Sequence, residues 1–177
     1  MTISKDNNSA NKITKVLLII YFIALFWILL FKLGVRFAYM EKRDVNFIPF
    51  RNFFLNDKID IGEIILNVVI FIPLGIYAGV LFKRWSFAKK LFFFFSISLM
   101  FETLQFIFKI GAFDVTDIIT NTSGGIIGVI IFVIIEKLFS NNFKAQKFIN
   151  IIAAITTALI ILLLILLKMN MLPIRYQ

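Results

Sequence analysis

The chain has 177 residues, 60% of them hydrophobic, and its mean hydropathy of +0.94 excludes an ordinary soluble domain. Cysteine and histidine are absent, which excludes disulfides, thiol catalysis, histidine-based triads and zinc sites built from these residues. We interpret the net charge of +9 as a topology signal of a membrane protein, and we do not expect nucleic acid as a partner.

Several apolar runs reach the roughly 20 residues needed to cross a bilayer core, so we expect an all-α, polytopic transmembrane bundle of about five spanning helices. A polar segment, 1–15, precedes the first predicted helix, Val16–Ala38. The connector 39–62 alternates charges with aromatic residues, and Pro49 interrupts any helix there. Such a segment suits the membrane interface, and an ordinary loop with a few buried aromatics is the alternative.

The second predicted helix, Glu63–Phe82, combines a polar side chain with helix-packing signals. It contains Asn67, and Pro73 removes one N–H, which leaves a carbonyl that needs a partner within the protein. Gly75 and Gly79 lie four residues apart and form a small face for close helix packing.

The third predicted helix, Leu91–Phe108, carries a polar stripe on one face, because its polar residues recur at steps of three and four. The fourth, Val115–Ile135, starts beside Asp114, which is suited to cap it, as is Thr116. Its polar and small residues, Asp117, Asn121, Gly124 and Gly128, share one face, and those of the third helix are Ser98, Glu102, Gln105 and Lys109.

A fifth predicted helix, Phe148–Leu167, is almost purely aliphatic and is expected to serve as an anchor. We therefore expect a cytoplasmic tail over 1–15, one membrane domain over 16–168 and a short tail over 169–177. The dense basic loop Lys83–Lys90 indicates that the N-terminus is cytoplasmic and the C-terminus extracellular.

With this topology, polar groups from several helices reach one depth near the outer leaflet. Asn67 lies about 6 Å, and Glu102 and Asn121 about 9 Å, from the outer ends of their helices. Lys32 and Arg36 lie on the outer part of the first helix. Buried polar residues at one depth predict a site, with Glu102 as its candidate acid or base. The candidate substrate-binding residues are Asn67, Gln105, Asp114, Asp117 and Asn121.

Two other interpretations of these residues stay open. The amides and carboxyls can act only as packing contacts between helices, each worth on the order of 1 kcal/mol. Asp114 and Asp117 can hold a hard cation, although two carboxylates three residues apart are weak evidence, so no metal or cofactor is expected.

Four motifs in these segments resemble the VanZ-like family in order and spacing, over about Asn46–Glu136. They are N-F-I-P-F at Asn46–Phe50, N-x-x-x-F-x-P-x-G at Asn67–Gly75, E-x-x-Q at Glu102–Gln105, and F-D-x-x-D-x-x-x-N-x-x-G-x-x-x-G at Phe113–Gly128. The resemblance implies a small multi-pass membrane protein. It also implies a link to reduced susceptibility to teicoplanin, a lipid-tailed glycopeptide antibiotic.

Three functions are consistent with these features. The first is a VanZ-like protein of the cell envelope whose outer-facing site binds or modifies an envelope component. That component would be a lipid headgroup, a lipid-linked cell-wall precursor or the surface target of a lipoglycopeptide. The second is a membrane enzyme that uses Glu102, and the third is a non-catalytic interaction protein whose polar residues assemble the helices.

The topology can be tested with single cysteines introduced at Ser86 and Ala112, since the natural chain has none. A membrane-impermeant thiol reagent applied to intact cells should label the cysteine at 112 and leave the one at 86 unmodified. Labelling at 86 alone would reverse the predicted orientation.

Overall fold

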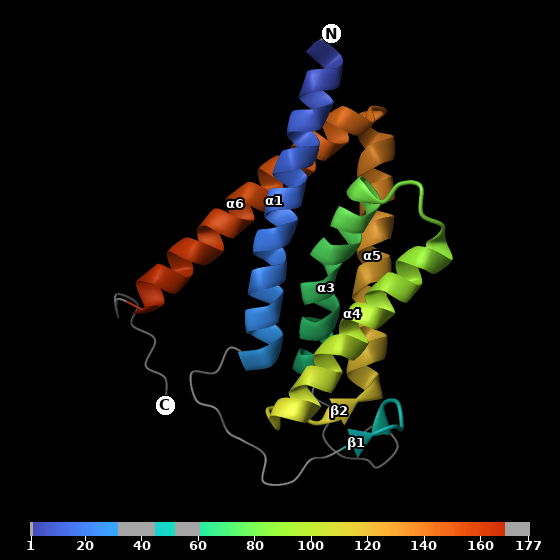
Figure 1. The fold of residues 1–177 in the computed structure, drawn as a ribbon, viewed down its shortest axis with the longest axis vertical. Helices are drawn as coiled ribbons and strands as arrows, with labels where there is room; N and C mark the ends of the chain where they lie inside the picture. The colour runs from blue at the N-terminus through green and yellow to red at the C-terminus, as the bar shows by residue number, and fades with distance from the viewer. Residues whose placement is uncertain (1, 32–44, 52–60, 169–177) are drawn as a thin grey trace.

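The computed structural model describes residues 2–31, 45–51 and 61–168, with side chains over 8–29, 45–51 and 61–159. These residues form an antiparallel helical bundle with one small strand pair, which confirms the predicted all-α fold (Figure 1). The elements are α1 (Thr2–Phe31), β1 (Val45–Asn46), α3 (Ile61–Leu81), α4 (Phe87–Phe108), β2 (Phe113–Asp114), α5 (Val115–Phe139) and α6 (Asn142–Lys168).

The ends of the bundle alternate as expected of a chain that crosses a membrane repeatedly. The start of α1 and the α3–α4 and α5–α6 connections lie at one end, and β1, β2 and the α4–α5 connection lie at the other (Figure 1). Within the described side chains, four helices are long and apolar enough to cross a bilayer: Asn8–Leu29, Ile61–Leu81, Phe87–Phe108 and Val115–Phe139. α6 is not among them, so a fifth crossing stays a prediction.

Several helix boundaries differ from those expected: α3 is shifted by one or two residues at each end, and α6 begins at Asn142 rather than at Phe148. Three further differences have a visible local cause. α1 begins at Thr2 and not at Val16, and its polar residues Asn11 and Thr14 form hydrogen bonds with α6. There Thr14 donates to the side chain of Asn150 (2.9 Å), and Asn150 donates to the carbonyl of Ala10 (3.1 Å). The predicted end of this helix at Ala38 lies outside the described residues.

The other two boundaries are set by caps. α4 begins at Phe87, four residues earlier than predicted, where the side chain of Ser86 accepts a hydrogen bond from the N–H of Lys89. α5 continues to Phe139 and ends at Ser140, whose backbone is left-handed.

The closest helix contact joins α3 and α5 through glycines. A Cβ added at Gly75 would lie 2.8 Å from the Cα of Gly128 and would overlap the carbonyl oxygen of Gly125. A Cβ at Gly124 would overlap the carbonyl oxygen of Val68, and one at Gly128 that of Ile72. The predicted close-packing faces are therefore confirmed, and they face each other.

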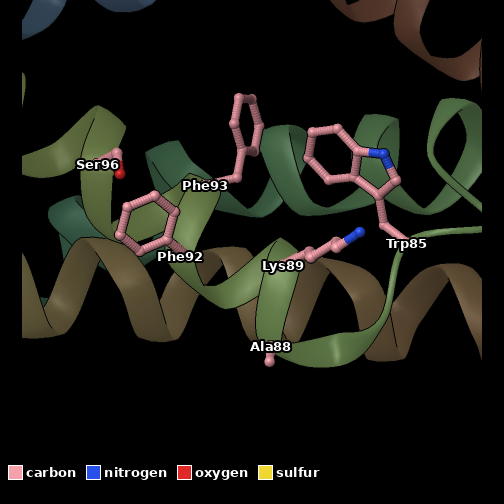
Figure 2. Close-up of a pocket in the computed structure, with 6 residues that line it drawn as sticks. All are labelled: Trp85, Ala88, Lys89, Phe92, Phe93 and Ser96. Carbon is pink, nitrogen blue, oxygen red and sulfur yellow. The ribbon is translucent and has the colours of Figure 1, made fainter.

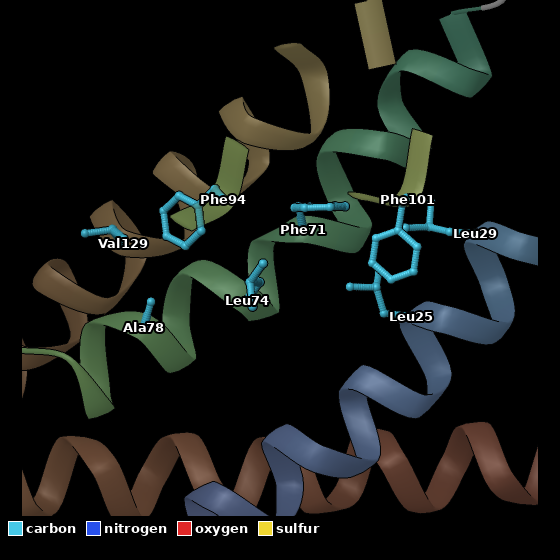
Figure 3. Packing of buried hydrophobic residues seen from close by; sticks show 8 residues of the cluster. All are labelled: Leu25, Leu29, Phe71, Leu74, Ala78, Phe94, Phe101 and Val129. Carbon is cyan, nitrogen blue, oxygen red and sulfur yellow. The ribbon is translucent and has the colours of Figure 1, made fainter. Parts of the chain in front are cut away.

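Large aromatic side chains fill the hollows that the glycines leave. Phe94 of α4 lies against Gly125, and Phe132 of α5 lies against Gly79, each at a distance that a Cβ would not tolerate. The main buried cluster continues from these contacts towards α1 (Figure 3). Its members are Leu25, Leu29, Phe71, Leu74, Ala78, Phe94, Phe101 and Val129.

The proline of α3 lies beside a hydrogen bond from another helix. Pro73 cannot donate to the carbonyl of Val69, and the sequence predicts that a protein group serves the exposed backbone there. In the structure the hydroxyl of Tyr21 in α1 donates to the neighbouring carbonyl of Ile70 (2.7 Å). The weakened turn of α3 is thus tied to α1.

The glycine contact can be tested by adding one methyl group at a time. Gly124→Ala and Gly128→Ala should each destabilise the protein by about 1–3 kcal/mol, because a backbone carbonyl of α3 cannot move aside for the new Cβ. Gly111→Ala is the matched control, since its Cβ would meet only the Gln105 side chain at 3.5 Å. Melting temperatures in detergent should fall for the first two variants only, and equal values for all three would disprove the contact.

Candidate functional site

A cavity of about 330 Å³ opens between four helices near the end that carries β1 and β2. Its polar walls come from α3, α4 and α5, and α1 supplies the apolar Ile28 and Leu29. The polar or charged lining residues are Glu63, Asn67, Glu102, Gln105 and Asp117. Four of the six predicted site residues therefore line one cavity.

Hydrogen bonds between helices fix two of the cavity's walls. The Nδ2 of Asn67 donates to the Oδ1 of Asp117 (2.8 Å), which joins α3 to the first turn of α5. The Nε2 of Gln105 donates to the carbonyl of Leu29 (2.8 Å), which joins α4 to α1. Both amides are buried, so each contact also satisfies a polar group that would otherwise be costly in an apolar surrounding.

Glu102 is the most deeply buried of the cavity's carboxyls, with 2% of its surface exposed. Its Oε2 accepts a hydrogen bond from the backbone N–H of Asp114 (3.1 Å). This bond holds the carboxyl at a defined position between α4 and the start of α5.

Asp114 lies beside the cavity and organises the surrounding backbone. Its Oδ1 accepts from the N–H of Thr116 (2.7 Å) and caps α5, as the sequence predicts. Its Oδ2 accepts from the Nδ2 of Asn46 (3.0 Å), so both carboxylate oxygens bind protein donors. Asp114 is therefore a positioning residue for Glu102 and for the segment that contains Asn46.

That segment, residues 45–51, which we call the β1 segment, lies along the start of α5. β1 pairs in parallel with β2, with Asn46 opposite Asp114. After Pro49 the backbone of Phe50 is left-handed (φ 53°), and its N–H donates to the Oγ1 of Thr116 (3.0 Å). A strained non-glycine residue held by a hydrogen bond marks a segment whose position is specified.

Asn121 lies apart from the cavity. Its Nδ2 donates to the Oγ of Ser98 in α4 (2.9 Å), and 1% of its surface is exposed. Its Oδ1 is buried and has no hydrogen-bond partner within the described part of the chain. Asn121 therefore joins α5 to α4 at a position one helical turn beyond the lining residue Asp117.

The structure thus divides the predicted site residues into two groups. Asn67, Glu102, Gln105 and Asp117 meet around the cavity, whereas Asp114 and Asn121 support it. Lys32 and Arg36, expected at the same depth, lie outside the described residues.

Two residues that hold the surroundings of the cavity in place are not among the predicted site residues. They are Asn46, which bonds to Asp114, and Thr116, which bonds to the β1 segment. The N-F-I-P-F motif was the signal that could have revealed Asn46.

Among the described side chains, no group of three or more His, Cys, Asp or Glu residues lies close enough to hold one metal ion, although Glu63, Glu102 and Asp117 line the same cavity. Asp114 and Asp117, the candidate cation ligands, bind Asn46 and Asn67 respectively. Carboxylates and amide oxygens that face a cavity instead suit a ligand with hydroxyl, amide or ammonium donors.

Comparison with known proteins identifies relatives over most of the chain. The VanZ/LLP1 family matches residues 18–136, from α1 to Glu136 in α5. Protein VanZ of Enterococcus faecium is 38% identical over 156 residues, which cover 84% of this chain and 89% of that protein. No solved structure matches significantly.

Removal of the Asp114 carboxylate should loosen the β1 segment. Asp114→Ala loses the cap of α5, worth about 1 kcal/mol, together with the bond to Asn46. Hydrogen exchange at the amide of Phe50 should become roughly tenfold faster, because its acceptor Thr116 lies in the uncapped turn. Ser86→Ala removes the cap of α4 at the other end of the bundle and should leave this amide unchanged. Unchanged exchange in Asp114→Ala would mean that other contacts hold the segment.

Proposed function

Because the chain belongs to the VanZ/LLP1 family, we propose that it is a membrane protein of the cell envelope whose cavity binds an envelope component. The VanZ-like resemblance further suggests that binding reduces susceptibility to teicoplanin. The observation that carries the proposal is the meeting of Asn67, Glu102, Gln105 and Asp117, from three helices, around one space of about 330 Å³.

The chemistry of the lining favours a ligand that donates hydrogen bonds. Glu63, Glu102 and Asp117 supply carboxylates, and Asn67 and Gln105 supply amides. Neither lysine nor arginine is among the described lining residues, so within the described part of the chain a bare phosphate would meet no positive charge in the cavity. Amino, hydroxyl or amide groups of a lipid headgroup or of a lipid-linked cell-wall precursor match the lining best.

The distribution of charge supports an outward-facing cavity. The end opposite the cavity is strongly basic, and positive charge favours the cytoplasmic side of a membrane. Its described basic residues are Lys12, Lys15, Lys83, Arg84, Lys89, Lys90, Lys137, Lys144 and Lys147. With this orientation the cavity opens near the outer leaflet, where lipid headgroups and exported precursors lie. The N-terminus would be cytoplasmic and the C-terminus extracellular.

A membrane enzyme is the second candidate, and the position of Glu102 favours it. This carboxyl is buried, faces the cavity and is oriented by the backbone of Asp114. A group held in this way is suited to exchange a proton with a bound headgroup. The third candidate, a purely structural role, is supported by the fact that Asn67 and Gln105 already bind protein partners.

The variant Glu102→Gln distinguishes a purely structural role from ligand binding and from catalysis. The amide keeps the shape of the side chain and an oxygen that can accept from Asp114, so stability should change by less than about 1 kcal/mol. If the carboxyl serves ligand binding or catalysis, the variant should lose teicoplanin tolerance while it accumulates normally in the membrane. Drug susceptibility and protein abundance should be measured on the same cultures.

Thr103→Val is the matched control, because Thr103 is the next residue of α4 and, within the described residues, its hydroxyl bonds only to the carbonyl of Leu99. This variant should behave like wild type. Full tolerance in Glu102→Gln at normal abundance would refute the site and leave the structural role. Lipid and muropeptide profiles of the same cells distinguish the membrane enzyme from the binding protein. A chemically changed lipid or muropeptide indicates turnover, and an unchanged profile indicates binding.

A further inference from the structure

A second hollow, of about 550 Å³, lies beside the α3–α4 connection, at the end of the bundle opposite β1 and β2. Figure 2 shows the side chains that line it. It runs along the first half of α4 and is lined by Trp85, Ala88, Lys89, Phe92, Phe93 and Ser96. We call it the α4 groove. Among the described lining residues only Lys89 is charged, and the others are mainly aromatic.

The aromatic wall of the α4 groove is held in place by stacked rings. Trp85 stacks on Phe82 with ring centroids 4.3 Å apart and planes at 13°. It also meets Phe93 edge-on, with centroids 5.9 Å apart and planes at 82°. On the other side, Phe92 has 70% of its surface exposed and no ring partner of this kind within the described residues. The groove is therefore a preformed apolar surface with one exposed edge.

The positive charge at the mouth of the groove is available to a ligand. Lys83, the neighbouring lysine at this end, is engaged by Glu136 (2.9 Å) and lies over the ring of Phe132. Lys89 is exposed and has no ion-pair partner in the described part of the chain. Arg84 and Lys90 are the sequence neighbours of the lining residues Trp85 and Lys89, and no acidic residue is among the described lining residues.

The depth of these residues matches the layout of a phospholipid. α4 has 22 residues and is therefore about 33 Å long, close to the roughly 30 Å of a bilayer core. Lys89 lies in its first turn, which a spanning helix would place near the headgroup phosphates. Phe92 and Ser96 follow about 5 and 11 Å further along the helix axis, which would place them towards the acyl chains.

From this geometry we propose that the α4 groove binds an anionic phospholipid of the leaflet at the basic end. Lys89 contacts the headgroup phosphate, and one acyl chain lies between Phe92 and the Trp85–Phe93 wall. Basic pockets beside spanning helices recognise anionic headgroups in this way. The binding is independent of the cavity at the other end and of its function.

Tryptophan fluorescence can test the binding, because the chain contains only Trp27 and Trp85. In a Trp27→Phe variant with wild-type melting temperature, Trp85 reports on the groove alone. The variant is placed in vesicles of equal phosphatidylglycerol and phosphatidylcholine content, in which only one of the two lipids carries brominated acyl chains. Brominated phosphatidylglycerol should quench Trp85 more strongly than brominated phosphatidylcholine does.

Lys89→Gln in the same background should reduce this preference about fivefold, because one lysine beside an anionic surface contributes on the order of that factor. Lys147→Gln is the matched control, since it removes an exposed lysine of the same end from α6, outside the groove. It should leave the preference unchanged.

Three results would overturn the proposal: equal quenching by the two lipids, a preference that survives Lys89→Gln, or an equal loss in both lysine variants. Protection of Trp85 from both brominated lipids, with a cross-linked dimer, would instead show that a second copy of the chain covers the groove.

Discussion

The glycine contact between α3 and α5 is the constraint on which the rest of the bundle depends. Only residues without a Cβ allow the two backbones to approach as closely as Gly75 and Gly128 do. This spacing brings Asn67 within 2.8 Å of Asp117 at one end of the pair. It also leaves the hollow at Gly125 that receives Phe94 of α4. Because Ser98, Glu102 and Gln105 follow Phe94 on the same face of α4, the seating of one phenylalanine fixes where these polar groups lie.

The buried carboxyl of Glu102 shows how the bundle accommodates a polar side-chain group in an apolar surrounding. Burial without hydrogen bonds would cost several kcal/mol, so the chain supplies a donor from the backbone of Asp114. Asp114 is in turn fixed by the cap of α5 and by Asn46. The β1 segment thereby becomes part of the support of the cavity, although it lies far from Glu102 in sequence. Changes in this segment are expected to reach the cavity through Asp114.

The two ends of the bundle differ in chemistry as well as in charge. One end presents carboxylates and amides around a cavity, and the other presents lysines beside a wall of stacked aromatic rings. Such an asymmetry suits a protein held in one orientation across a membrane, where one end faces an anionic leaflet. A ligand rich in hydrogen-bond donors at one end and an anionic lipid at the other would each meet a surface of matching chemistry.

The sequence by itself determined the class of fold, four of the five predicted apolar spans and the small faces of α3 and α5, because hydropathy and residue spacing are local properties. It also predicted the cap at Asp114 and a common depth for Asn67, Glu102, Gln105 and Asn121, of which the first three line the cavity together with Asp117. Only the tertiary structure decided that Asp114 and Asn121 support the cavity rather than line it, since this depends on how the helices are rotated about their axes. The pairing of Asn46 with Asp114, and the extension of α1 by contacts of Thr14 with Asn150, were also beyond the sequence. Both join residues distant in the chain, and no periodicity within one segment encodes such a partner.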